Sequence, residues 1–291
     1  MRATIILLAA LTTVLTGSVQ ARTELYVSPG GSDAAEGTAD APLASLTGAR
    51  DRLREMRASE QVDGHVHVIL HGGTYVLAEP FELGPEDSGT RQSVVTYRAA
   101  QGERVVISGG SEITGWQRAA DGSWSADVNG DWAFRQLFIR HEGDDWWQRR
   151  YRPHLGPFVI AGLTDSPARE GQPHRQSQID FVYHPGDIEQ WPNLGDVEVV
   201  ALHDWSASRL RIADIDTERS VVTFTERPVY RIGHWWEGGR NPYYIENVGE
   251  ALDQPGQWYH DRAEGTLTYL PLPGEELGSL ELVASRLETL V

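Results

Sequence analysis

Apolar and polar positions follow two different periods along the chain. Leu46, Ala49, Leu53 and Met56 recur at the spacing of one helix face, and Ser45 stands where an N-cap is expected. These residues predict one amphipathic helix near the N-terminus. The patterns after it are those of strands, so we expect an all-β protein apart from this helix.

Short apolar runs on both sides of this helix have the length and composition of β-strands. Gly, Pro or acidic turns separate them at spacings typical of the stacked coils of a parallel solenoid. The helix can then cover the open end of the stack, whose exposed edge would otherwise promote aggregation. The predicted strands are residues 23–28, 65–70, 74–77, 93–99 and 104–108.

The composition changes at Trp116. From there to about Gly274 the chain is rich in aromatic residues and holds all ten tryptophans. Several segments alternate apolar and polar positions, as antiparallel strands with one solvated face do. A hairpin predicted over Leu252–Pro271 closes this region. We expect a capping helix and first coils over 22–115, an inserted antiparallel β-domain over 116–274, and a return to coils over 275–291.

The first residues, "MRATIILLAALTTVLTGSVQA", have the layout of a secretory signal peptide over 1–21. An early Arg precedes an apolar core that is too short to span a bilayer, and Val19-Gln20-Ala21 forms a small-x-small exit. We therefore expect export, to the medium or the periplasm, after cleavage near Ala21.

The charge balance excludes several classes of partner. Asp and Glu number 42 against 25 Arg, for a net charge of -17. Nucleic acids and anionic membranes both require a basic footprint, so neither is expected as a partner. The same excess disfavours, more weakly, a polyanionic sugar. The chain has no cysteine, so its stability must come from packing, and its oligomeric state stays open.

The segment "LHDWSASRLRI" is the first candidate binding cluster. On one strand beginning near Val197, His203, Trp205, Arg209 and Arg211 would alternate onto one face. An aromatic plate and guanidinium donors on that face could hold a sugar ring and its hydroxyls. The alternative is that Trp205 belongs to the core and the arginines pair with nearby acids.

The segment "RIGHWWEGGRNPYY" is the second candidate binding cluster. Trp235 and Trp236 are followed by Gly-Gly, and Arg240 with His234 and Glu237 could complete a sugar subsite. The alternative is that one tryptophan packs inward and the other covers a loop.

No catalytic, metal or cofactor site is assigned from these residues. His65 and His67 would share one strand face at a spacing compatible with a metal, but no third ligand is evident. The acidic pairs at 144–145 and 275–276, and the run at 214–218, resemble ordinary solvated turns. The signatures of serine hydrolases, P-loop proteins and EF-hands are absent.

An ordered set of motifs carries a family resemblance: "YVSPGGSDAAEGTADAPLASLTGARDRLR", "HVILHGGTY", "ISGGSEITGW", "RQLFIR", "LHDWSASRLRI" and "ENVGEALDQPGQWYHDRAEGTLTYLP". Together they resemble the N-terminal part of secreted right-handed parallel β-helix proteins of the pectate-lyase-like class, and most of all glycoside hydrolase family 141. The resemblance implies the start of such a β-helix, interrupted by the inserted domain. It also implies a glycosidase whose catalytic carboxylates lie beyond Val291.

Solenoid physics gives the same expectation about length. About three or more repeats are needed for stability, and each end of the stack needs a cap. The sequence shows an N-terminal cap and no C-terminal one, so we expect the N-terminal portion of a longer product, inactive by itself.

Two other functions stay open. A polysaccharide lyase would share the solenoid, would commonly rely on Ca²⁺ or Arg, and would release an unsaturated product. A noncatalytic glycan-binding or adhesive β-helix protein would bind polysaccharide or oligosaccharide without releasing any product.

Overall fold

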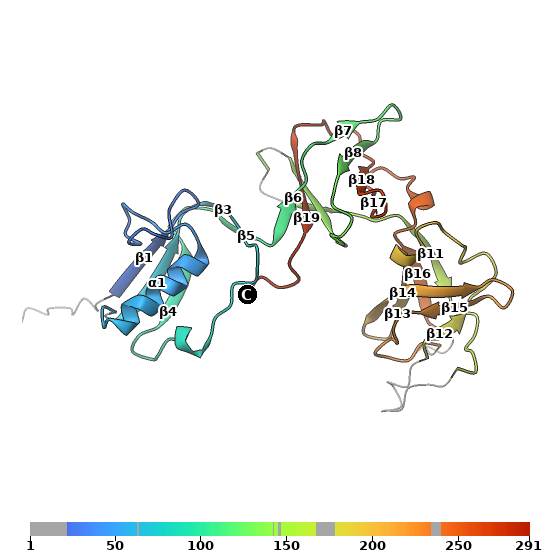
Figure 1. The fold of residues 1–291 in the computed structure, drawn as a ribbon, viewed down its shortest axis with the longest axis horizontal. Helices are drawn as coiled ribbons and strands as arrows, with labels where there is room; N and C mark the ends of the chain where they lie inside the picture. The colour runs from blue at the N-terminus through green and yellow to red at the C-terminus, as the bar shows by residue number, and fades with distance from the viewer. Residues whose placement is uncertain (1–21, 63, 142, 145–146, 167–177, 234–239) are drawn as a thin grey trace, which may run out of the picture. The chain divides into compact units, whose positions relative to one another are not determined.

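The computed structural model describes residues 22–62, 64–141, 143–144, 147–166, 178–233 and 240–291 (Figure 1). The protein is mostly β, with 37% strand and 9% helix, as the sequence predicts. It divides into two compact units, which are described separately. Unit 1 comprises the described residues up to Gly109 together with Leu287–Val291, and unit 2 comprises Gly110–Arg286.

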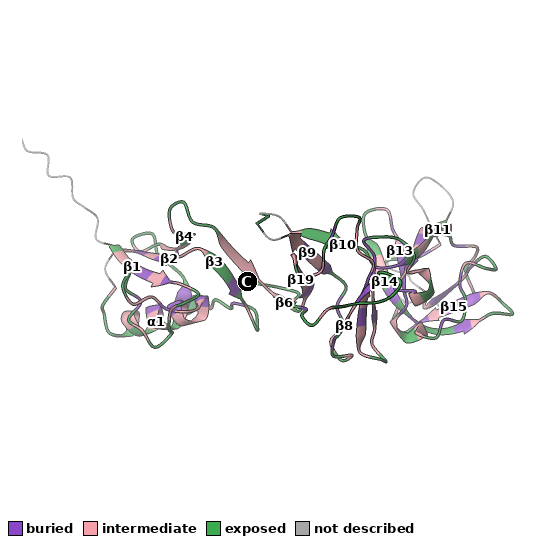
Figure 2. Cartoon of the chain, turned by 90° about the horizontal axis from the view of Figure 1, so that it is seen from above, coloured by how far each residue is buried: buried purple, intermediate pink, exposed green. Residues whose placement is uncertain are grey.

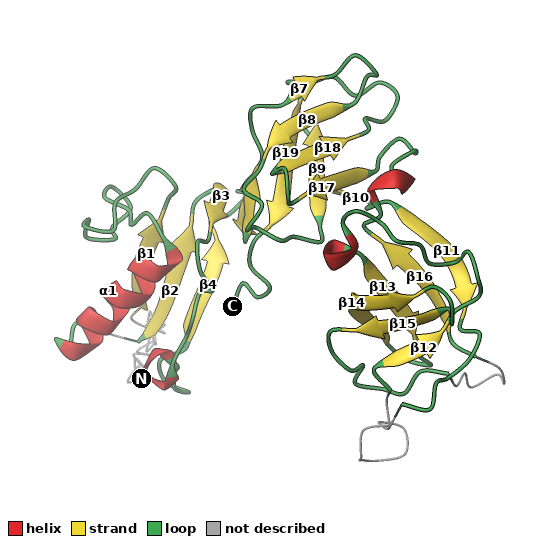
Figure 3. Ribbon diagram, turned by 45° about the vertical axis from the view of Figure 1, so that its right-hand side comes forward, coloured by secondary structure: helices red, strands yellow, loops and turns green. Residues whose placement is uncertain are grey.

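The predicted helix is present in unit 1 as α1 (Leu46–Ala58). The Ser45 hydroxyl accepts a hydrogen bond from the Gly48 N–H at 2.9 Å, which confirms the predicted N-cap. Leu46, Ala49 and Leu53 are buried, and they join the apolar side chains of the neighbouring strands in one core. Figure 3 shows α1 lying along a sheet of this unit.

The strands of unit 1 pair in parallel. Two sheets form, ordered β1-β2-β4 and β3-β5, and every pairing within them is parallel. Residues 65–76 supply β2 and β3, and residues 95–108 supply β4 and β5, so each segment contributes one strand to each sheet. Unit 1 therefore holds two partial parallel sheets. The strands are β1 (Arg22–Val27), β2 (His65–Leu70), β3 (Gly73–Val76), β4 (Val95–Ala99) and β5 (Val105–Ser108).

The first part of unit 2 is a pair of antiparallel sheets. Their orders are β10-β9-β19-β6 and β17-β18-β8-β7. Side chains from both sheets, including Leu137 and Leu282 from one and Trp124 and Trp258 from the other, form one core. The predicted hairpin is confirmed as β17 paired with β18. The strands are β6 (Gly110–Glu112), β7 (Gln117–Arg118), β8 (Trp124–Asp127), β9 (Leu137–His141), β10 (Gln148–Arg150), β17 (Trp258–Asp261), β18 (Thr266–Tyr269) and β19 (Leu280–Ser285).

The second part of unit 2 is a six-stranded antiparallel sheet ordered β11-β16-β13-β14-β15-β12. Buried positions alternate along β16, whereas β13 is buried over four consecutive residues. Figure 2 shows buried residues along the strands of this sheet, and the side chains of Val199, Leu210 and Tyr243 belong to a core of its own. The strands are β11 (His154–Val159), β12 (Asp180–Val182), β13 (Glu198–Leu202), β14 (Ala207–Asp216), β15 (Val221–Phe224) and β16 (Pro242–Glu246). Three short 3-10 helices are described: η1 (Pro85–Asp87) in unit 1, and η3 (Leu194–Asp196) and η4 (Gly249–Ala251) in unit 2.

The segment after residue 274 belongs mainly to unit 2. β19 pairs antiparallel with β6 and β9, and Leu282 and Ala284 enter the core between the two sheets. The units therefore divide at 109/110 and 286/287, whereas the sequence places boundaries at 115/116 and 274/275. Among the described residues, no helix is long and apolar enough to cross a membrane.

Candidate functional site

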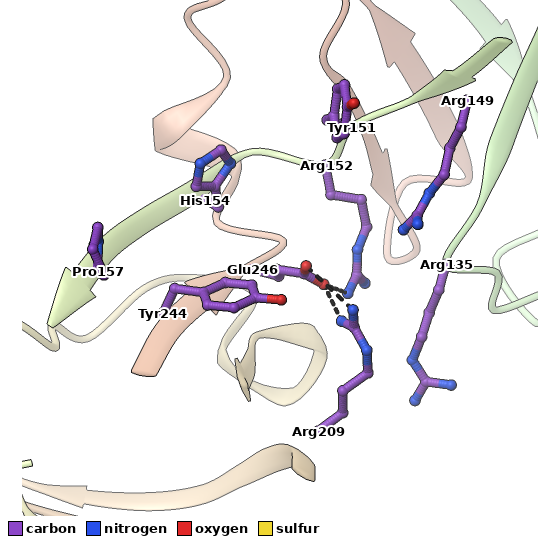
Figure 4. Close-up of a pocket in the computed structure, with 10 residues that line it drawn as sticks. Arg135, Arg149, Tyr151, Arg152, His154, Pro157, Arg209, Tyr244 and Glu246 are labelled. Atoms are coloured by element: carbon purple, nitrogen blue, oxygen red, sulfur yellow. Dashed lines mark hydrogen bonds and ion pairs between the residues drawn. The ribbon is translucent and has the colours of Figure 1, made fainter. Parts of the chain in front are cut away.

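A cavity of about 430 Å³ opens in unit 2, beside the six-stranded sheet (Figure 4). Its wall is unusually rich in arginine for a chain with an acidic excess. The strands β10, β11, β14 and β16 supply most of its wall. The lining residues are Arg135, Arg149, Tyr151, Arg152, His154, Gly156, Pro157, Arg209, Tyr244 and Glu246.

Strand alternation explains why these side chains meet. In β16, Tyr243 and Ile245 are buried in the core, so Tyr244 and Glu246 face the other way. The register places Val200 of β13 opposite both Tyr244 and Arg209, which puts the latter two on the same face of the sheet. The pairing of β11 with β16 shifts register between Leu155 and Phe158, at the Gly156–Pro157 wall of the cavity.

A network of ion pairs forms the floor of the cavity. Glu198, only 2% exposed, accepts hydrogen bonds from Arg135 at 2.6 and 2.9 Å and from Arg152 at 2.6 Å. Arg152 also donates to Glu246 at 2.5 Å, and Arg209 pairs with the same Glu246 carboxylate. Glu198 and Glu246 occupy opposed positions on β13 and β16, so Arg152 bridges two neighbouring carboxylates. The three arginines outnumber the two carboxylates, which leaves a positive floor.

The arginines keep both carboxylates ionised. Burial opposes ionisation of Glu198, but hydrogen bonds from Arg135 and the charge of Arg152 outweigh it and lower its pKa to about 2. Burial opposes ionisation of Glu246 in the same way, and Arg209 and Arg152 lower its pKa below the ordinary value. Neither carboxyl group is therefore suited to act as a general acid near neutral pH.

Acidification is expected to destabilise unit 2 through Glu198. Its pKa is about 2 in the folded chain against an ordinary 4.5, so the unfolded state binds the proton at higher pH. The stabilisation is therefore complete above about pH 5 and is lost as the pH falls toward about 2. Urea unfolding followed by tryptophan fluorescence at a series of pH values measures this. Glu198→Gln should show a weaker pH dependence over that range, and an unchanged dependence would contradict the assignment.

The first predicted binding cluster is divided by a turn. The His203 N–H donates to the Ser206 carbonyl at 2.7 Å, so Asp204 and Trp205 form the tip of the β13–β14 hairpin rather than part of one strand. The prediction of one continuous face is therefore wrong. Trp205 is 93% exposed, which also makes the core alternative wrong. His203 is buried, with its Nε2 atom 2.8 Å from the Ser208 hydroxyl oxygen.

Of this cluster, only Arg209 lines the cavity. Arg211 lies two residues further along the same exposed face of β14 and does not line it. The alternative that these arginines pair with acids holds for Arg209, whose partner is Glu246. Whether any of the four residues binds a sugar stays a prediction.

The second predicted cluster falls largely outside the described residues. Trp235, Trp236, His234 and Glu237 all lie there. Arg240 is described and exposed, and its guanidinium lies near Gly162 and not in the cavity wall.

Sequence reasoning missed most of the cavity. Arg149, Tyr151 and Arg152 come from "QRRYRP", a short polar run between two better patterned regions. Three arginines and one aromatic residue within four positions were the available signal, but that signal does not show which residues of other segments lie next to them. Tyr244 and Glu246 alternate with buried Tyr243 and Ile245, which is a signal that a strand prediction over 242–246 would have used.

One of the acidic pairs differs from the prediction. Glu275 is 7% exposed, so its interpretation as a solvated turn charge is wrong. Its carboxylate accepts hydrogen bonds from Arg150 and from the Tyr269 hydroxyl, each at 2.5 Å. Glu276 next to it is exposed, as predicted.

The two histidines of β2 are half-buried. His65 Nδ1 accepts a hydrogen bond from the Val94 N–H at 3.1 Å, so that nitrogen has a protein partner. Within the part of the chain that the structure describes, no group of three or more His, Cys, Asp or Glu residues is placed to hold a metal ion.

Comparisons with known proteins give partial matches. No family model matches the chain. Pectate lyase PEL9 of Emericella nidulans is 37% identical over 100 residues, 34% of this chain and 22% of the relative. The uncharacterized protein YwoF of Bacillus subtilis is 34% identical over 116 residues, 37% of this chain and 22% of the relative. A solved structure described as a glycoside hydrolase matches with a TM-score of 0.71 and 28% identity.

The structural match covers 92% of this chain and 47% of the glycoside hydrolase. The chain thus spans about a fifth of the length of the curated relatives it matches, and about half of that solved structure. These similarities place the fold among those of carbohydrate-active proteins.

Proposed function

We propose that this chain is the N-terminal, substrate-shaping part of an exported glycoside hydrolase with a right-handed parallel β-helix, resembling glycoside hydrolase family 141. The observation that supports it most is the match to a glycoside hydrolase over 92% of the chain. The parallel pairing of β1, β2 and β4, beside that of β3 and β5, supports the β-helix. A leader over 1–21, ahead of the described residues, is part of the same proposal.

The cavity has the properties of a saccharide-binding site. Its volume of about 430 Å³ lies in the range of small-molecule sites, roughly 300–1,000 Å³. Tyr151 and Tyr244 supply aromatic surface. Arg149 and Arg209 supply N–H groups that can donate hydrogen bonds to the hydroxyl oxygens of a sugar. In this proposal a polysaccharide or oligosaccharide is the substrate, and the cavity holds one of its sugar units.

In this proposal the cavity binds the saccharide, and hydrolysis takes place elsewhere. Glycoside hydrolysis uses one carboxyl group as acid and another as base or nucleophile. Glu198 and Glu246 are held ionised by arginines, which leaves no protonated acid between them. The catalytic carboxylates are therefore proposed on later coils, in the part of such a hydrolase that this chain does not cover.

A polysaccharide lyase is the second candidate. It is favoured by the similarity to pectate lyase PEL9 of Emericella nidulans, which extends over 100 residues of this chain. Such an enzyme breaks the chain by removing a proton next to a uronate carboxylate, and its product carries a new double bond. A noncatalytic glycan-binding protein is the third candidate, because the cavity needs no catalytic residue in order to bind.

The test uses the protein purified from the culture of its source organism, at whatever length the cells export. It is incubated with a panel of neutral and acidic polysaccharides, and new reducing ends and ultraviolet absorbance of unsaturated products are measured together. New reducing ends without unsaturation are the expected result. Unsaturated products would replace the hydrolase with the lyase, and binding without products would favour the third candidate. The absence of both binding and products would overturn a carbohydrate function.

A further inference from the structure

The cavity concentrates positive charge in a strongly acidic protein. The chain has a net charge of -17, yet four arginines line this one cavity, against a single lining carboxylate, Glu246. Glu198 beneath them adds a second negative charge. The local balance is therefore positive, the opposite of the chain as a whole.

The four arginines are not equivalent. Arg135, Arg152 and Arg209 are each held by Glu198 or Glu246. Within the described ranges, the Arg149 guanidinium makes no ion pair or hydrogen bond, and it lines the cavity. Figure 4 shows the Arg149 side chain extending from its strand toward the side of the cavity where Arg152 meets Glu246.

The neighbour of Arg149 fixes its direction. Arg150, the next residue of β10, is buried and bonded to Tyr269 and Glu275 on the opposite side of the strand. Successive side chains of a strand point to opposite faces, so this anchor turns Arg149 outward. The strand thus fixes the side on which the unpaired guanidinium lies, so a ligand in the cavity meets it without a rearrangement of the backbone.

We infer that this cavity takes a sugar unit bearing an anionic group, and that Arg149 pairs with that group while Tyr151 and Tyr244 contact the ring. This inference rests on the proposed carbohydrate function. A carboxylate of a uronic acid and a sulfate ester share the required chemistry, since both accept the paired N–H donors of a guanidinium. The general acidity of the chain disfavours polyanions at its surface, and the positive cavity restricts their binding to this site.

The experiment measures binding by isothermal titration calorimetry to the exported protein. The ligands are a galacturonate trisaccharide, its methyl ester, the neutral galactose trisaccharide and a sulfated galactose trisaccharide. An anionic ligand, whether carboxylate or sulfate, should bind about ten-fold or more tighter than its neutral counterpart, and added salt should weaken it. The comparison of the acid with its methyl ester needs no mutation of the protein.

Two matched variants locate the charge. Arg149→Gln should weaken binding of the anionic ligand by roughly 10- to 100-fold, the effect of one charge-assisted hydrogen bond. Arg219→Gln, in the β14–β15 turn and outside the cavity wall, should leave binding unchanged. Tryptophan fluorescence during unfolding checks that both variants fold.

The outcomes separate the two proposals. Equal binding of charged and neutral ligands, or an unchanged Arg149→Gln variant, would overturn the anionic site while leaving the carbohydrate function intact. Failure of every saccharide to bind would remove both. Preference for sulfate over carboxylate, or the reverse, supports the inference and identifies the source of the charge.

Discussion

Replacing Arg152 with methionine is expected to lower the free energy of unfolding of unit 2 by about 3 kcal/mol. Arg152 is the only described residue that bonds both Glu198 and Glu246. Without it, two neighbouring carboxylates repel each other in a largely buried site, and each keeps one arginine partner. Removing one member of a buried ion pair costs about 3–5 kcal/mol, and the remaining partners place this variant at the lower end.

Chemical denaturation followed by tryptophan fluorescence measures this effect in the right unit. All ten tryptophans lie between Trp116 and Trp258, inside unit 2, so their signal reports the unfolding of that unit. Arg149→Met is the matched control, since it removes an arginine from the same cavity that makes no ion pair among the described residues. The control should change stability by no more than about 0.5 kcal/mol.

The two variants should also respond differently to pH. Loss of Arg152 takes away one of the positive charges that lower the pKa of Glu198. The carboxyl group of the variant can then take up a proton at a higher pH, which removes the repulsion between the acids. The deficit of Arg152→Met should therefore shrink as the pH falls from about 7 to about 4. A deficit that is absent at neutral pH, or equal to that of Arg149→Met, would show that the network does not stabilise the unit.

The elements that depend on local sequence were predictable. Ser45 caps α1, and Leu46, Ala49 and Leu53 are buried, because an N-cap and a helical period are properties of consecutive residues. The strand "HVHVIL" is β2 at the predicted residues 65–70 for the same reason. Parallel pairing could be predicted as well, since the intervening segments are too long and irregular for hairpin turns.

The turn at Asp204 and Trp205 shows where local patterns fail. Apolar and polar residues alternate on both sides of it, so the two strands look like one continuous strand in the sequence. Only the pairing of Leu202 with Ala207 reveals the hairpin. A two-residue turn takes little sequence, and Asp204 and Ser206 were its only chemical signals.

The cavity could not be predicted because its parts are distant in sequence. Arg135, Arg152, Glu198, Arg209 and Glu246 come from separate segments, and their meeting depends on the register of β13 with β14 and β16. Single-sequence reasoning identified Arg209 for its type and position, but gave no sign of its partners.

Replacing Glu275 with glutamine is expected to have a larger effect than Arg152→Met. The expected loss is about 3–5 kcal/mol in the free energy of unfolding of unit 2. Arg150 and Glu275 are both almost fully buried, with side chains 5% and 3% exposed. The carboxylate also accepts hydrogen bonds from the Tyr269 hydroxyl and from the Leu272 N–H at 2.7 Å. Burial and the hydrogen bond to Glu275 raise the pKa of Tyr269, which keeps this hydroxyl protonated as a donor.

Glutamine has nearly the same shape as glutamate, so the substitution removes the negative charge and little packing. Arg150 then remains buried with no counterion, and one amide N–H₂ faces groups that also donate. The neighbouring Glu276→Gln is the matched control, because Glu276 is 77% exposed and its contact with Arg118 spans 3.6 Å. A surface pair of this kind contributes at most about 1 kcal/mol.

The same change at adjacent positions thus separates a buried charge from a solvated one. Denaturation followed by tryptophan fluorescence should show a large loss for Glu275→Gln and almost none for Glu276→Gln. If the two variants were equally stable, the buried ion pair would not hold β10 against the β17–β18 hairpin, and Arg150 would not direct Arg149 into the cavity.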